Sequence, residues 1–168
     1  MSETTITPEA SLKAEAYLNR LEEAGLGKDA ANVRSVVKSF NNVCLIQNRK
    51  AQLYAIGGTV SEPLPRKDID LKITFEKEET GSDERYSYEE SLEHFRKDFK
   101  PLVDQIAQES GIEIDQTQEP VEEEDLPGIL RSEGWVTLRP QGTPIQILSN
   151  FQPGEISQLA PAVLMAPQ

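Results

Sequence analysis

The sequence predicts an α+β fold with an N-terminal helical hairpin, and two patterns lead to that prediction. Apolar residues recur at helical spacing through residues 12–44. Further along the chain, short runs of alternating apolar and polar residues, typical of strands, are separated by glycines and prolines. A chain of 168 residues suits one domain that buries a substantial core, so we assign residues 1–168 to a single domain.

Two helices open the chain, after a polar segment at residues 1–6 that we expect to be disordered. Thr7 and Pro8 have the residue types preferred at the cap and at the first position of a helix. Gly25 is expected to end this helix, and Asp29 is expected to cap the second one. The apolar stripe of the second helix comprises Val33, Val36, Val37, Phe40, Val43 and Cys44. A buried position in that stripe suits Cys44 as a small apolar residue rather than as a nucleophile.

The next elements are two strands, predicted at residues 52–56 and 68–75. The first strand ends at Gly57-Gly58. Pro63 and Pro65 leave room for only a single helical turn between the two strands. The local sequence therefore predicts a strand, a glycine bend, one turn of helix and a second strand.

The second half of the chain predicts a helix, a short strand and a hairpin. A capping box opens the helix at residues 87–90, and Pro101 is expected to kink or split it. Residues 112–115 alternate as a short strand does, and residues 134–139 and 143–149 have the pattern of a β-hairpin. His94 is expected to face solvent, and a short helix is expected after Pro153.

The formal net charge of −12 restricts the binding partners. Binding to extended nucleic acid needs a surface rich in Lys and Arg, which this composition argues against. Much of the negative charge lies in two segments, at about 76–86 and 117–128, that we expect to be solvated acidic loops. The sequence shows no signal peptide and no apolar run long enough to span a bilayer, so we expect a cytoplasmic protein without a membrane partner.

The pair Asp68 and Asp70 is the most informative pattern in the chain. Residues i and i+2 of a strand point to the same face, so the two carboxylates project side by side. They repel each other unless a cation lies between them, and Mg²⁺ suits one or two carboxylates together with substrate phosphates. Gly57 and Gly58 precede this pair and allow the backbone to approach a phosphate closely. Taken separately, each motif is more often a simple turn or a solvated strand edge.

Together, Gly57, Gly58, Asp68 and Asp70 resemble the polymerase-β-like nucleotidyltransferase superfamily, over residues 52–73. The resemblance implies a nucleotidyltransferase-like core, in which helices pack on a mixed β-sheet. It also implies Mg²⁺-dependent transfer of a nucleoside monophosphate from an NTP to a hydroxyl acceptor. In that mechanism Asp68 and Asp70 are catalytic residues and metal ligands, and the glycine pair receives the triphosphate.

Three basic residues are expected to assist nucleotide binding. Arg66 and Lys67 precede the aspartate pair, and Lys72 shares its strand face by parity. Their charges could neutralise those of a triphosphate.

The family uses a third carboxylate, and the matching position in this chain falls at Gln146. An amide is neutral and cannot serve as a general base. Glu113 and Asp115, which share a face if their segment is a strand, are the candidates for the missing acid. Otherwise the activity survives on two carboxylates at a reduced rate, or the protein has kept the fold and lost the chemistry.

Three functional hypotheses therefore stay open. The first is an active nucleotidyltransferase. The second is a catalytically inactive nucleotidyltransferase-fold module that acts through nucleotide or protein binding. Small members of the superfamily pair with a separate helical protein, so the resemblance implies a partner that supplies a helical substrate-binding part. The third is an acidic structural domain with an accidental motif, which predicts that Asp68 and Asp70 lie far from the backbone of Gly57.

Overall fold

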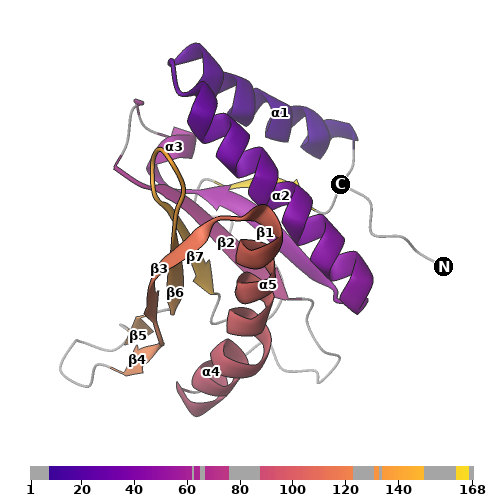
Figure 1. The fold of residues 1–168 in the computed structure, drawn as a ribbon, viewed down its shortest axis with the longest axis vertical. Helices are drawn as coiled ribbons and strands as arrows, with labels where there is room; N and C mark the ends of the chain where they lie inside the picture. The colour runs from indigo at the N-terminus through magenta and orange to yellow at the C-terminus, as the bar shows by residue number, and fades with distance from the viewer. Residues whose placement is uncertain are drawn as a thin grey trace.

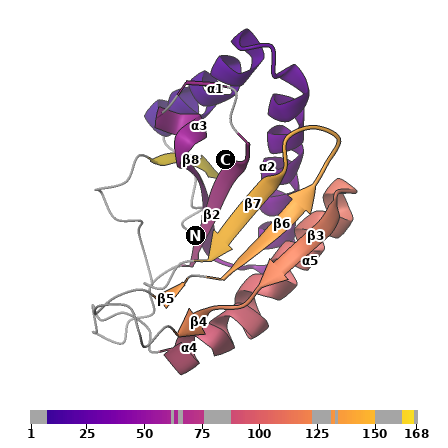
Figure 2. The same cartoon turned by 90° about the vertical axis from the view of Figure 1, so that its left-hand side faces the viewer.

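The fold is a helical layer packed on one face of a six-stranded mixed sheet (Figures 1 and 2). This computed structural model describes the following residues: 8–61, 63–64, 67–75, 88–122, 131–132, 134–149 and 162–166. The predicted α+β class is confirmed. No helix in these ranges has both the length and the apolar character needed to cross a membrane.

The predicted N-terminal helical hairpin is present as α1 (Pro8–Glu23) and α2 (Gly27–Gln47), which lie side by side (Figure 1). Its contact surface is the apolar stripe that the sequence shows. The buried side chains include Tyr17, Leu18 and Leu21 of α1 and Val33, Val36 and Phe40 of α2. The capping role expected for Asp29 is wrong, because α2 begins two residues earlier, without a side-chain cap.

The main sheet has the strand order β3-β6-β7-β2-β1-β8. Its strands are β1 (Ala51–Ile56), β2 (Ile69–Phe75), β3 (Glu113–Gln118), β6 (Trp135–Arg139), β7 (Ile145–Ser149) and β8 (Ala162–Ala166). Neighbouring strands are antiparallel except β2 and β7, which are parallel. The predicted hairpin of residues 134–149 is therefore β6–β7, and its second strand lies directly beside the strand that carries Asp70.

The predicted single helical turn is α3 (Gly58–Ser61), which connects β1 to β2. These two strands are antiparallel neighbours, and Ile56 at the end of β1 pairs with Asp70 near the start of β2. Because this connection is short and the strands are antiparallel, the glycine bend at the end of β1 lies next to the start of β2, which carries Asp70.

One continuous helical rod follows, comprising α4 (Tyr88–His94), a π-helical turn η1 (Phe95–Phe99) and α5 (Lys100–Ser110). Pro101 does not split it. A proline lacks a backbone N–H and crowds the carbonyl four residues earlier, and a wider turn relieves that crowding. The wider turn is seen where the Lys100 N–H donates to the Phe95 carbonyl, five residues back. Gly111 ends the rod in the left-handed conformation, with φ 72°.

Three expectations about the second half of the chain are corrected. The acidic segment 117–128 is not entirely loop, because β3 runs to Gln118 and the strand β4 (Val121–Glu122) pairs with β5 (Arg131–Ser132) in a small second sheet. The described residues after Pro153 form a strand, β8, rather than a helix. His94 is largely covered, with 14% of its side chain exposed, because its ring packs edge-on against Phe75. Segments 1–6 and 76–86 lie outside the described residues.

The sheet has one apolar face and one more polar face. Along β2 and β7, alternate residues are buried beneath the helices, among them Leu71, Ile73 and Ile147. Asp70, Lys72 and Gln146 alternate with them and are only half-buried. Strand parity therefore places the candidate site residues on the sheet face away from the helical layer.

Candidate active site

The backbone of Gly57 and the carboxylate of Asp70 are in close contact. Gly57 has φ +73°, and a Cβ atom built there would lie 2.8 Å from Asp70 Oδ2. Any other residue would therefore meet both an unfavourable backbone conformation and the carboxylate. One prediction of the accidental-motif hypothesis, that Asp70 lies far from the backbone of Gly57, is therefore wrong.

Asp68 is the residue immediately before β2, the strand that carries Asp70. It is exposed, while the intervening Ile69 is buried at 1% exposure. The Ile69 N–H donates to the Pro144 carbonyl at 2.9 Å, which fixes the start of β2 against the segment leading into β7. The alternation of burial through Asp68, Ile69 and Asp70 agrees with two carboxylates on the side away from the core.

The basic residues predicted near the site differ in their placement. Lys67 is exposed and adjacent in sequence to Asp68. Lys72 follows Asp70 on the same strand face and is opposite Tyr54 of β1. Arg66 lies outside the described residues. The described chain thus brings at least one lysine, Lys72, to the sheet face that carries Asp70.

Gln146 of β7 lies directly beside Asp70, because the parallel register pairs the two residues. With its amide turned to satisfy both neighbours, Gln146 Nε2 donates to Asp70 Oδ1 at 3.2 Å, and Gln146 Oε1 accepts from Trp135 Nε1 at 3.2 Å. The position at which the resemblance implies a third carboxylate is therefore filled by a neutral amide, held between an indole and the aspartate.

Glu113 and Asp115, the candidates for the missing acid, are not brought to Asp70. They lie on β3 at the edge of the sheet, and β6 and β7 separate that strand from β2. Three strand spacings amount to about 14 Å. The Asp115 carboxylate instead accepts from Arg139 at 2.8 Å. Over the residues that the structure describes, no three His, Cys, Asp or Glu side chains gather in a way that could hold a metal ion.

Two residues of α1 that the sequence did not single out hold the glycine bend in place. The Tyr17 hydroxyl is hydrogen-bonded to Thr59 Oγ1 at 2.9 Å, and both residues are buried. Arg20 donates to the backbone carbonyls of Thr59 at 2.6 Å and Val60 at 2.9 Å. The short α3 turn after Gly57 is therefore anchored to a long, well-packed helix.

The environment of Tyr17 also shows that the bend and the aspartate share one electrostatic neighbourhood. Burial raises the pKa of the Tyr17 hydroxyl, the hydrogen bond with Thr59 opposes that shift, and the negative charge of Asp70 raises the pKa further. In the sequence, Tyr17 fits the apolar stripe of a helix, so nothing in the pattern distinguished its hydroxyl from an ordinary core position.

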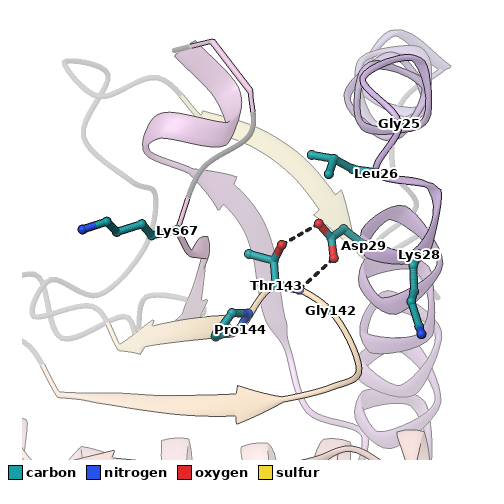
Figure 3. Close-up of a pocket in the computed structure, with 8 residues that line it drawn as sticks. All are labelled: Gly25, Leu26, Lys28, Asp29, Lys67, Gly142, Thr143 and Pro144. Carbon is teal, nitrogen blue, oxygen red and sulfur yellow. Dashed lines mark hydrogen bonds between the residues drawn. The ribbon is translucent and has the colours of Figure 1, made fainter.

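A shallow hollow lies between the α1–α2 loop and the β6–β7 turn (Figure 3). It is lined by Gly25, Leu26, Lys28, Asp29, Lys67, Gly142, Thr143 and Pro144. Asp29 is 4% exposed and accepts from Thr143 N at 2.9 Å and Thr143 Oγ1 at 2.5 Å. The ammonium groups of Lys28 and Lys67 point away from that pair in Figure 3. Asp29 thus joins the start of α2 to the β6–β7 turn.

The donor atoms at Asp68 and Asp70 suit one hard divalent cation. Mg²⁺ is usually held by one or two carboxylates and completes its octahedron with water and substrate phosphates. The absence of a side chain at Gly57 leaves the Asp70 carboxylate against bare backbone, where a phosphate could approach both. The residues present therefore suit a magnesium ion that is held by two carboxylates and by phosphate oxygens. They do not match a site that uses three carboxylates.

No protein-family model matches this chain, and a search of curated proteins finds none that is significantly similar to it.

Proposed function

We propose that this protein is a nucleotidyltransferase-like module that binds a magnesium-bound nucleoside triphosphate and acts through that binding rather than through nucleotidyl transfer. The observation that carries the proposal is the contact between the Gly57 backbone and the Asp70 carboxylate. In this arrangement a carboxylate that can bind a metal ion lies next to backbone amide groups that can bind a phosphate.

In this proposal, Asp68 and Asp70 hold Mg²⁺, which when bound neutralises charge on the triphosphate. The backbone of Gly57 and Gly58 receives the phosphate oxygens, because a glycine has no side chain of its own to obstruct their approach. Lys72 adds positive charge on the same sheet face. Tyr17 and Arg20 keep the bend in its conformation through Thr59 and Val60.

Binding is favoured over transfer because of the residue beside Asp70. Transfer to a hydroxyl acceptor requires a group that takes up the hydroxyl proton, and an amide cannot do so. Gln146 is the residue in register with Asp70, and the acids Glu113 and Asp115 lie at the distant edge of the sheet. The chemistry at hand therefore supports recognition of a nucleotide better than its activation.

Isothermal titration with ATP, CTP, GTP and UTP, with and without Mg²⁺, tests the proposal. We expect at least one triphosphate to bind only in the presence of Mg²⁺, and Asp70→Asn to weaken this binding about tenfold or more, through loss of a ligand charge. Asp115→Asn makes the same chemical change on the edge strand β3 and should leave the affinity unchanged. Absence of Mg²⁺-dependent binding to all four triphosphates would refute the proposal.

Slow transfer on two carboxylates is the second candidate function, favoured by the fit of Asp68 and Asp70 to one cation. Incubation of the protein and a cell extract with α-³²P-labelled triphosphates tests it. A labelled product that disappears in the double variant Asp68→Ala/Asp70→Ala supports transfer. Recovery of a stoichiometric helical partner, equally by the wild type and by that double variant, supports a module that acts through protein binding.

A further inference from the structure

We infer that Gln146 is a positioning residue that restricts the site beside Asp70 to one divalent cation. This inference rests on the proposed function, since it concerns the cation that would accompany the nucleotide. It is drawn from the direction in which the Gln146 amide is held.

The indole of Trp135 sets the direction of the amide. An indole N–H is a donor only, so it must meet an acceptor, and the acceptor it meets is Gln146 Oε1 at 3.2 Å. The amide nitrogen is then left facing Asp70, where Nε2 donates to Oδ1 at 3.2 Å. Both partners favour the same orientation, because turning the amide over would place its oxygen against a carboxylate oxygen and its nitrogen against the indole N–H.

This orientation of the amide determines which atoms of Gln146 would face a second cation beside Asp70. A divalent cation needs an oxygen lone pair, and Gln146 presents N–H groups, which carry partial positive charge, on the side of Asp70. Its oxygen is directed to Trp135 and already accepts a hydrogen bond. The amide therefore fixes Asp70 Oδ1 and offers no ligand of its own.

Among the residues that the structure describes, the side chains beside Asp70 and Gln146 on this face supply no substitute. Lys72, two residues after Asp70, is positively charged, and Thr137, opposite Gln146 on β6, carries only a neutral hydroxyl. Two divalent cations a few ångströms apart repel each other strongly unless carboxylates offset their charge. From the protein, Asp68 and Asp70 supply two carboxylates, the number that usually holds one such cation together with substrate phosphates.

The test replaces the amide with a carboxylate of the same size. Gln146→Glu keeps an acceptor for Trp135 and turns the second oxygen towards Asp70, so it creates the third carboxylate. Gln116→Glu is the matched control, because it adds the same charge at an exposed position of β3, away from Asp70. Equilibrium dialysis counts the Mn²⁺ ions bound per chain in the presence of inorganic tripolyphosphate, which supplies phosphate oxygens without a base.

We expect Asp70→Asn to bind one ion fewer than the wild type, Gln146→Glu to bind one ion more, and Gln116→Glu to bind the same number. The only tryptophan of the chain, Trp135, locates the ion, because bound Mn²⁺ should quench its fluorescence more strongly in Gln146→Glu than in the wild type. The inference is overturned if Gln146→Glu gains no ion, or if Asp70→Asn loses two. If Asp70→Asn and the wild type bind equally, the proposed function itself fails, and the inference falls with it.

The melting temperature, measured with and without Mn²⁺, gives a second readout that does not depend on counting ions. Without metal, the new carboxylate of Gln146→Glu faces Asp70, so the melting temperature should fall relative to Gln116→Glu and should recover when Mn²⁺ is added. Gln146→Asp, with a shorter side chain, provides a second version of the same change. A melting temperature that Mn²⁺ raises equally in the Gln146 and Gln116 variants would contradict the inference.

Discussion

Replacing Gly57 with alanine should disturb the contact on which the candidate site depends, and the structure contains an internal control for this change. Gly57 has φ +73° and would place a Cβ atom 2.8 Å from Asp70 Oδ2. Gly111 has nearly the same φ, +72°, and a Cβ atom there would meet nothing within 4 Å. Gly111→Ala therefore measures the backbone cost alone, and Gly57→Ala adds the collision with the carboxylate.

The expected magnitudes follow from these two situations. A left-handed backbone conformation costs alanine about 1 kcal/mol, so Gly111→Ala should lower the free energy of unfolding by about that amount. Gly57→Ala should lower it by about 2–3 kcal/mol, because the Asp70 side chain must also move away from the new Cβ atom, which strains its hydrogen bond with Gln146. For a chain of this length these values correspond to about 2–4 °C and about 4–12 °C in the melting temperature.

Thermal unfolding and isothermal titration together measure the effect. Displacement of the Asp70 carboxylate should weaken Mg²⁺-dependent nucleotide binding about tenfold or more in Gly57→Ala, while Gly111→Ala binds as the wild type does. Equal losses of stability and equal affinities in the two alanine variants would refute the reasoning, because the contact with Asp70 would then have no measurable consequence.

Three further predictions concern the side chains of Asp29, Tyr17 and Cys44. Asp29→Ala should lower the free energy of unfolding, measured by urea denaturation, by about 2–4 kcal/mol, because it removes two charge-assisted hydrogen bonds from Thr143. A loss below about 0.5 kcal/mol would contradict this role. Tyr17→Phe removes the hydrogen bond to Thr59 and should cost about 1 kcal/mol at neutral pH. Because the pKa of Tyr17 is raised in the folded state, its contribution to stability falls as pH rises above 10.0. The free energies of unfolding of the wild type and Tyr17→Phe should therefore converge at high pH. A difference that stays constant across that range would argue against the raised pKa. Partial burial raises the pKa of Cys44 from 9.0 to about 11, so the native thiol should react with a disulfide reagent at pH 8 about 100-fold more slowly than the thiol in urea. Equal rates would contradict the raised pKa.

The helices and strands were predictable where local periodicity decides them. The apolar stripe of α2, the single turn between β1 and β2, and the β6–β7 hairpin each depend on residues within a few positions of one another. β8 was missed because its residues, 162–166, are apolar without a clear alternation, and they become a strand by pairing with β1. The edge of an existing sheet, rather than the local sequence, decides that conformation.

At the candidate site, the sequence alone determined which residues are candidates: the glycine pair, the alternate aspartates Asp68 and Asp70, and Gln146 at the position where the resemblance implies a third acid. The tertiary structure decided their partners. Strand order placed Glu113 and Asp115 at a far edge, and register placed Gln146 between Trp135 and Asp70. The physical reason is that periodicity reports which face a side chain occupies, whereas its neighbours on that face come from strands distant in the chain, whose order and register depend on the packing of the whole fold.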